Sequence, residues 1–168
     1  MRFHTIPAFL AAACLLIACT ACQSVPYSNR SQFMLTSVSY ENEQGAEAWK
    51  EILKTENLST NQTAVNALNR VGPRIAEASA QKDFQWEFKV IESEQANAFC
   101  LPGGKVALYT GILPYMDNDA EMAVVIGHEV SHAIARHGGE RMSQGYIQNA
   151  GAAVVSVLMS DSAYKDLA

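Results

Sequence analysis

Apolar residues recur at two different spacings along the chain, and the spacing changes near residue 83. Before that point they come three or four positions apart, in residues 41–54 and again from residue 59 or 60 onward. The positions concerned are Ala46, Trp49, Ile52, Leu53, Val65, Leu68, Val71 and Ile75. This spacing places them on one face of an α-helix. We therefore expect two amphipathic helices, the second carrying Pro73, a residue able to bend it.

In residues 83–92 the period becomes two. Aromatic and aliphatic residues alternate there with polar ones, at Phe84, Trp86, Phe88 and Val90. Strict alternation predicts a half-buried strand. Two further strands are expected at residues 98–101 and 105–110, because the Pro-Gly-Gly sequence between them is typical of a tight turn.

The period returns to a helical one after residue 117. Asn118 and Glu121 have the spacing of a capping box and stand directly before the apolar run MAVVIG. The helix is expected to run to about His137 and to end at Gly138-Gly139, since glycine is common at helix C-termini. A last helix should occupy residues 140–159. The whole pattern predicts an α+β fold, mainly helical with a small sheet.

The first residues have the pattern of an export signal. Arg2 precedes an almost wholly apolar run from Ile6 to Ala18, which is too short to span a bilayer at about 20 residues. The sequence LIAC, ending at Cys19, resembles a bacterial lipobox, and CTAC, ending at Cys22, is a second candidate. We expect residues 1–21 to be a lipoprotein signal peptide cleaved before Cys19 or Cys22. Residues 22–37 would then be a tether, and residues 38–168 a single domain anchored by acyl chains.

Composition narrows the function classes. The chain has 168 residues and a formal net charge of −5, which argues against a nucleic-acid partner. Of its four cysteines, Cys100 is interpreted as a small buried apolar residue and not as a nucleophile. The apolar run of residues 150–159 suits packing against another helix. Membrane insertion is the alternative, although ten residues are too few to span.

The sequence HEVSH, from His128 to His132, carries the chemistry. Residues four apart on a helix lie on the same face, so both imidazoles can bind one metal ion. Zn²⁺ accepts such ligands and keeps an open position for water in catalytic sites. Glu129, turned about 100° around the helix axis, would act as general base toward that water. We expect one Zn²⁺ per chain, held by His128 and His132, with Glu129 as the catalytic residue.

His137 does not fit the longer HExxHxxGxxH pattern, because it follows His132 by five residues and no glycine separates them. A capping or supporting role for Arg136 and His137 is favoured over metal ligation.

These motifs resemble a known family. The sequences NAFCLPGGKVALYTGIL and DNDAEMAVVIGHEVSHAIARHGGER are similar to the bacterial branch of zinc metallopeptidase family forty-eight. The resemblance implies a zincin-type fold in which an edge strand borders the active-site cleft and holds an extended substrate by β-addition. The strand residues would be Val106, Ala107, Leu108, Tyr109 and Thr110. Asn97 and the turn 102–104 would support that strand, and the alignment of the tether favours Cys22 as the lipidated residue.

The resemblance also implies a third zinc ligand, a glutamate in an ExxxD-like motif on a later helix. No such motif occurs between Gly138 and Ala168, and nothing around Asp161 or Asp166 supports either as the ligand. We therefore expect the chain to be an N-terminal fragment, or a truncated gene product, of a longer protease.

Two hypotheses of function follow. The first is a zinc metalloendopeptidase, lipid-anchored in the periplasm at the outer membrane, that cleaves unfolded or misassembled envelope proteins. Its quality-control role is implied by the resemblance alone. The alternative is a non-proteolytic binding or outer-membrane assembly factor that keeps the peptide-binding strand.

Overall fold

The computed structural model describes residues 22–25 and 30–160, and the predicted signal segment with Cys19 lies outside them. The chain divides into two compact units. One is Ser37–Gly138, and the other comprises Met1–Thr36 with Gly139–Ala168. Each is described by itself.

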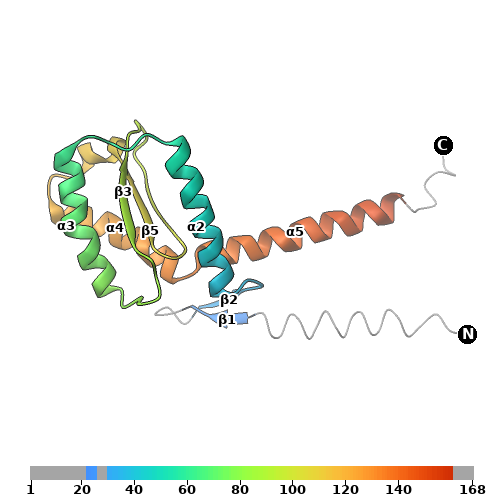
Figure 1. The fold of residues 1–168 in the computed structure, drawn as a ribbon. Helices are drawn as coiled ribbons and strands as arrows, with labels where there is room; N and C mark the ends of the chain where they lie inside the picture. Colours follow the sequence, from blue (N-terminus) through green and yellow to red (C-terminus); the bar gives the residue numbers. More distant parts are fainter. Residues whose placement is uncertain (1–21, 26–29, 161–168) are drawn as a thin grey trace, which may run out of the picture. The chain divides into compact units, whose positions relative to one another are not determined.

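The Ser37–Gly138 unit is built on a three-stranded mixed sheet (Figure 1). Its strands are β3 (Glu87–Ile91), β4 (Ala98–Leu101) and β5 (Lys105–Tyr109), in the order β3-β5-β4. β5 runs parallel to β3 and antiparallel to β4. The predicted turn joins β4 to β5 through Gly103 and Gly104, whose φ angles of 82° and 86° are favoured by glycine.

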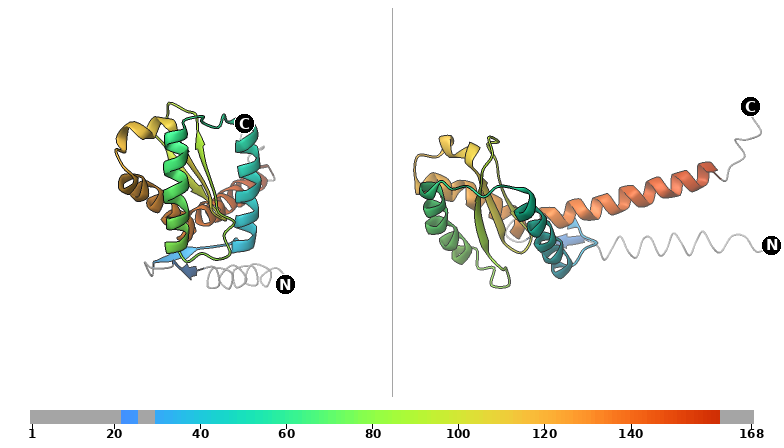
Figure 2. Two further views of the ribbon diagram at one scale, coloured as in Figure 1. Left: turned by 60° about the vertical axis from the view of Figure 1, so that its left-hand side comes forward. Right: turned by 45° about the horizontal axis from the view of Figure 1, so that its top comes forward.

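Helices cover both faces of this sheet (Figures 1 and 2). α3 (Gln62–Ala78) and α4 (Asp119–Ile134) pack on one face, and α2 (Val38–Thr55) packs on the other. Successive β5 residues point to opposite sides, so Val106 and Leu108 join the core beneath α3 and α4, whereas Ala107 contacts the cluster around Trp49 of α2. The predicted mainly helical α+β fold is confirmed.

The predicted edge strand is wrong in one respect. Residues 106–109 belong to β5, which is the central strand, and Thr110 begins the 3-10 helix η1 (Thr110–Tyr115). Val106, Ala107 and Leu108 are each 0% exposed, so their backbone groups must be paired within the sheet. Among the described residues, the strands at the sheet edges are β3 and β4. β4 lies along α4, the helix that carries the HExxH sequence.

Element boundaries follow local hydrogen bonding. The Ser37 side chain accepts from the Tyr40 amide and starts α2, and Asn61 does the same for α3 through the Ala64 amide. Both predicted helices are confirmed, with Pro73 inside α3. β3 is shorter than predicted and begins at Glu87, because Phe84 and Trp86 pack against each other before the strand starts.

A second difference concerns the end of α4. The sequence predicts a stop at Gly138-Gly139, but the helix ends at Ile134 and Arg136 takes a left-handed φ of 56°. The next helix, α5 (His137–Ser160), begins one residue later, so the two glycines lie in its first turn. Tertiary contacts of Arg136, described below, stabilise this break at a residue other than glycine.

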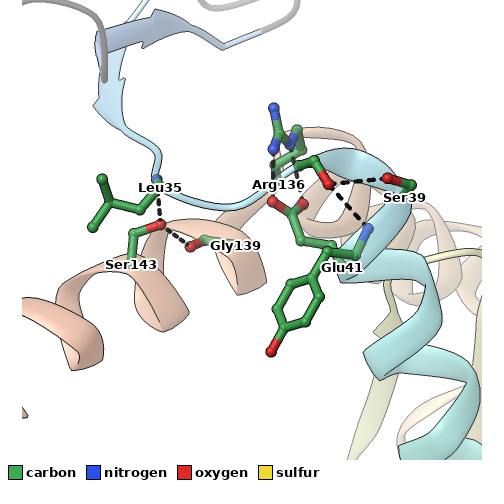
Figure 3. A network of polar contacts seen from close by, with 8 residues as sticks. Leu35, Ser39, Glu41, Arg136, Gly139 and Ser143 are labelled. Atoms are coloured by element: carbon green, nitrogen blue, oxygen red, sulfur yellow. Dashed lines mark hydrogen bonds and ion pairs between the residues drawn. The ribbon is translucent and has the colours of Figure 1, made fainter. Parts of the chain in front are cut away.

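The second unit contains a short hairpin and most of α5. β1 (Cys22–Ser24) pairs antiparallel with β2 (Ser31–Phe33). Arg30 forms a 2.6 Å ion pair with Glu140 of α5. The Ser143 hydroxyl accepts from the Leu35 amide and donates to the Gly139 carbonyl (Figure 3). Among the described residues, no helix is both long and apolar enough to cross a membrane.

A glycine contact tests the packing of α2 against the β4–β5 turn. A Cβ atom at Gly45 would lie 2.2 Å from the Pro102 carbonyl oxygen, so Gly45→Ala should destabilise the unit by about 1–3 kcal/mol. Gly127→Ala is the matched control, since its Cβ meets no described atom within 4 Å and alanine favours helix by up to about 1 kcal/mol. Urea unfolding of both variants measures the difference. Equal stability for the two would contradict this packing.

Candidate metal centre

The N-terminus of α4 is held by the predicted capping box. The Asn118 side-chain oxygen accepts from the amides of Ala120 and Glu121 at 2.9 and 3.0 Å. The Glu121 carboxylate reaches back and accepts from the Asp117 amide at 2.7 Å. The two bonds to Asn118 satisfy amides that a helix start leaves without partners. They fix where α4 begins, and hence which of its residues face the core.

The apolar stripe of α4 sets the orientation of the HExxH residues. Met122, Ile126, Val130 and Ala133 are buried beneath the helix. Residues between these positions point elsewhere, so His128 is exposed while Glu129 and His132 are half-buried. The candidate ligands are therefore reachable from solvent.

The two histidines converge as their spacing predicts. Nε2 of His128 lies 3.0 Å from Nε2 of His132, and the ring centroids are 4.5 Å apart. A Zn–N bond measures about 2.0–2.1 Å, so a single ion can contact both nitrogens at this separation. In the part of the chain that the structure describes, no group of three His, Cys, Asp or Glu side chains is placed to hold a metal. The structure thus brings together two candidate ligands, and Asp161 and Asp166 lie outside the described residues.

His137 lies against the second candidate ligand, His132. Its Nδ1 lies 2.6 Å from Nδ1 of His132, the ring nitrogen on the other side from His128. Metal-binding histidines commonly use their second nitrogen for a contact of this kind, which holds the ring in place. His137 therefore contacts a candidate ligand, through the nitrogen that does not face His128.

β4 lies beside the candidate general base. Cys100 of β4, interpreted from the sequence as a buried apolar residue, is partly buried and packs against the core beneath α3 and α4. Burial, together with the nearby negative charge of Glu129, raises the pKa of the Cys100 thiol to about 12. The side chain is therefore a neutral thiol near Glu129.

A distant residue completes the surroundings of the site. Glu41, in the first turn of α2, binds Arg136 through two contacts of 2.6 and 3.0 Å. Sequence reasoning missed this pair because 95 residues separate its members. The one available signal was an acidic residue on an otherwise apolar helix face, and such residues are common at helix N-termini.

Comparison with known proteins places this site in a family. The model of Peptidase family M48 matches residues 61–166, which include the sheet, α4 and all three HExxH residues. The chain belongs to this family. The resemblance inferred from the sequence is thereby confirmed.

Individual M48 relatives match over more of this chain than of their own length. The mitochondrial metalloendopeptidase OMA1 of Schizosaccharomyces pombe is 35% identical over 74% of this chain and 38% of its own. OMA1 of Saccharomyces cerevisiae is 34% identical over 82% of this chain and 44% of its own length. The beta-barrel assembly-enhancing protease of Yersinia pestis is 32% identical over 46% of this chain and 16% of its own length. The chain thus spans less than half the length of these relatives.

The residues present fit the zinc ion expected for an M48 metallopeptidase. Zinc accepts imidazole nitrogen, and the side chains supply two such nitrogens that face each other within reach of one ion. One of the rings also has the second contact typical of metal-binding histidines. The donor set described is two nitrogens, with Glu129 adjacent in sequence.

The raised pKa of Cys100 has a measurable consequence. A shift from 9.0 to about 12 lowers the thiolate fraction near neutral pH roughly a thousandfold, and the thiolate is the form that alkylating reagents attack. Native protein treated with iodoacetamide at about pH 8 should carry almost no label on Cys100, whereas urea-unfolded protein should be labelled fully. Peptide mapping by mass spectrometry separates Cys100 from the N-terminal cysteines. Equal labelling rates in both states would contradict the burial of this thiol.

Proposed function

We propose that this chain supplies zinc ligands and the general base of a metalloendopeptidase. One observation carries the proposal: the Nε2 atoms of His128 and His132 face each other at 3.0 Å, on a capped helix inside the segment that matches the family. Glu129 stands next to the first histidine on the same helix. The names of the OMA1 relatives, which describe metalloendopeptidases, support the same activity.

Each side chain has a distinct role in this proposal. His128 and His132 hold the ion through Nε2, and the second contact of His132 with His137 keeps its ring oriented. When bound, zinc polarises a carbonyl group and lowers the pKa of water. Glu129 takes a proton from the attacking water and delivers it to the leaving amine, the work of a positioned carboxylate. Its half-burial limits competition from bulk solvent for that proton.

The substrate strand of the proposal is β4, in place of the residues 106–110 expected from the sequence. β4 is at the edge of the sheet, lies along α4 and brings Cys100 near Glu129. An extended peptide can pair with the edge of a strand through main-chain hydrogen bonds. Paired on β4, such a peptide would lie beside the candidate general base. An extended substrate implies cleavage of unfolded segments in preference to folded domains.

Substrate class and location are part of the same proposal. We take unfolded or misassembled envelope proteins as substrates and an outer-membrane lipid anchor facing the periplasm as the location. The name of the Yersinia pestis relative, a beta-barrel assembly-enhancing protease, supports this choice, whereas the names of the OMA1 relatives place those proteins in mitochondria. The lipobox-like sequences at Cys19 and Cys22 favour the bacterial envelope.

The lipid anchor can be tested at the N-terminus. Expressed with its full sequence in a bacterium, the protein should enter the membrane fraction with an acylated N-terminal cysteine. Cys22→Ala should abolish acylation if the family alignment is right, and Cys19→Ala if the better lipobox decides. Mass spectrometry of the mature N-terminal peptide identifies the residue. A cleaved protein without acyl chains would contradict the anchor.

The catalytic assignment is tested by separating metal binding from turnover. Glu129→Gln should retain zinc and lose cleavage of unfolded casein by at least about a hundredfold, since general-base catalysis contributes 10²–10⁴. His128→Ala should lose zinc as well. Glu77→Gln, an exposed carboxylate of α3, is the matched control and should behave as wild type. Zinc is measured by atomic emission and cleavage by gel.

Two outcomes would overturn this function. Unchanged casein cleavage by Glu129→Gln would remove the proposed base. A wild-type chain with neither zinc nor cleavage would favour the alternative, a non-proteolytic binding or assembly factor that uses the β4 edge.

A further inference from the structure

We propose that the Glu41–Arg136 ion pair is a positioning device for the metal centre. It holds the left-handed turn that places His137 against Nδ1 of His132, and so directs Nε2 of His132 toward the metal. The inference rests on the proposed function, since it assigns a role to residues around the candidate zinc ligands. Arg136 and Glu41 act through His137 and do not touch the reacting atoms.

The backbone at the end of α4 has an unusual conformation. The Ala135 and Arg136 amides donate to the carbonyls of Ser131 and Ala133 at 2.9 and 3.0 Å, which closes the helix. Arg136 then has a φ of 56°, a conformation that crowds the Cβ of any residue except glycine. Two glycines follow at residues 138 and 139, yet the left-handed position is two residues before them. An interaction of the Arg136 side chain can offset this cost.

The ion pair is that interaction. Nη2 of Arg136 lies 2.6 Å from Oε1 of Glu41, and Nε lies 3.0 Å from Oε2, a two-point contact with the planar guanidinium (Figure 3). The side chains of Arg136 and Glu41 are only 17% and 3% exposed, so water cannot replace the interaction between their charges. Glu41 is anchored in the first turn of α2, where a negative charge is favoured. The pair thus ties the turn to a separate helix.

The turn determines the position of His137. This residue directly follows Arg136 and begins α5, so the backbone conformation of Arg136 helps to set where its ring lies. Nδ1 of His137 is 2.6 Å from Nδ1 of His132. With a hydrogen on Nδ1 of His132 donated to His137, Nε2 of His132 keeps its lone pair on the side that faces His128. The opposite direction of donation would leave Nε2 protonated and unable to bind metal.

The chain offers a matched control for this pair. Arg70 of α3 forms a similar two-point contact with Asp119 of α4, at 3.0 and 2.8 Å. It too joins α4 to another helix, but at the opposite end from the histidines, and its side chains are 59% and 45% exposed. Removing it should weaken packing of α4 without changing the position of His137.

The experiment measures Zn²⁺ affinity of the full chain by competition with a chelating dye. Arg136→Gln and Glu41→Gln should each weaken binding by about tenfold to a hundredfold, the usual effect of losing support for a metal-binding histidine. Arg70→Gln should bind as wild type does. Circular dichroism and thermal melting show whether each variant is folded.

A second pair of variants keeps the test decisive if Arg136→Gln fails to fold. His137→Phe preserves an aromatic ring but removes the acceptor, and should weaken zinc binding to the same extent. His137→Asn supplies a side-chain oxygen at the place of Nδ1 and should restore most of the affinity. A purely structural role for His137 would give no such rescue.

The outcomes separate this inference from the proposed function. If the wild-type chain binds no Zn²⁺, the proposed function itself fails. If it binds Zn²⁺ and the Arg136, Glu41 and His137 variants bind equally well, only the positioning role is overturned. The same holds if Arg70→Gln weakens binding as much as Arg136→Gln, or if His137→Asn fails to exceed His137→Phe.

Discussion

Burial of β5 on both faces is the constraint around which the Ser37–Gly138 unit is arranged. Val106, Ala107 and Leu108 are completely buried, so every amide and carbonyl along this strand needs a partner inside the protein. β3 and β4 provide those partners on either side. Helices must then cover both faces, and α2 takes one while α3 and α4 take the other. The HExxH helix lies on one of these faces, mainly along β4 and in part over the central strand.

Polar contacts add precision to this apolar framework. Lys105, at the start of β5, is nearly buried and binds the carboxylate of Glu87 at 2.6 Å. The Trp49 indole donates to the same carboxylate, so one acidic group links α2 to two strands. Donation by Lys105, and then by Trp49, holds the pKa of Glu87 below its usual range. Glu87 therefore remains charged at neutral pH, and its contacts hold the first residues of β3 and β5 against α2.

Both local and non-local interactions position the histidine side chains of the candidate metal centre. Helix periodicity alone puts His128 and His132 on one face, and the Asn118 cap settles where that helix starts. The ring orientation of His132 depends in addition on His137, which comes from the next helix. That contact rests in turn on the left-handed Arg136 and on Glu41 from α2. The candidate ligands lie in one short sequence motif, but residues of three helices, α2, α4 and α5, position them.

The sequence by itself determined the elements whose signals are local: the amphipathic helices, the β4–β5 hairpin around Pro102, the capping box at Asn118 and the histidine pair. Each follows from side-chain period or from hydrogen bonds between near neighbours. Only the tertiary structure decided that β5 is central and β4 the edge, because the pairing partners of a strand are not encoded in its own alternation. The tertiary structure also decided that α4 ends at Ile134, before the left-handed Arg136, and not at Gly138-Gly139 as predicted. A buried ion pair across 95 residues can stabilise a backbone conformation that glycine adopts more readily than other residues.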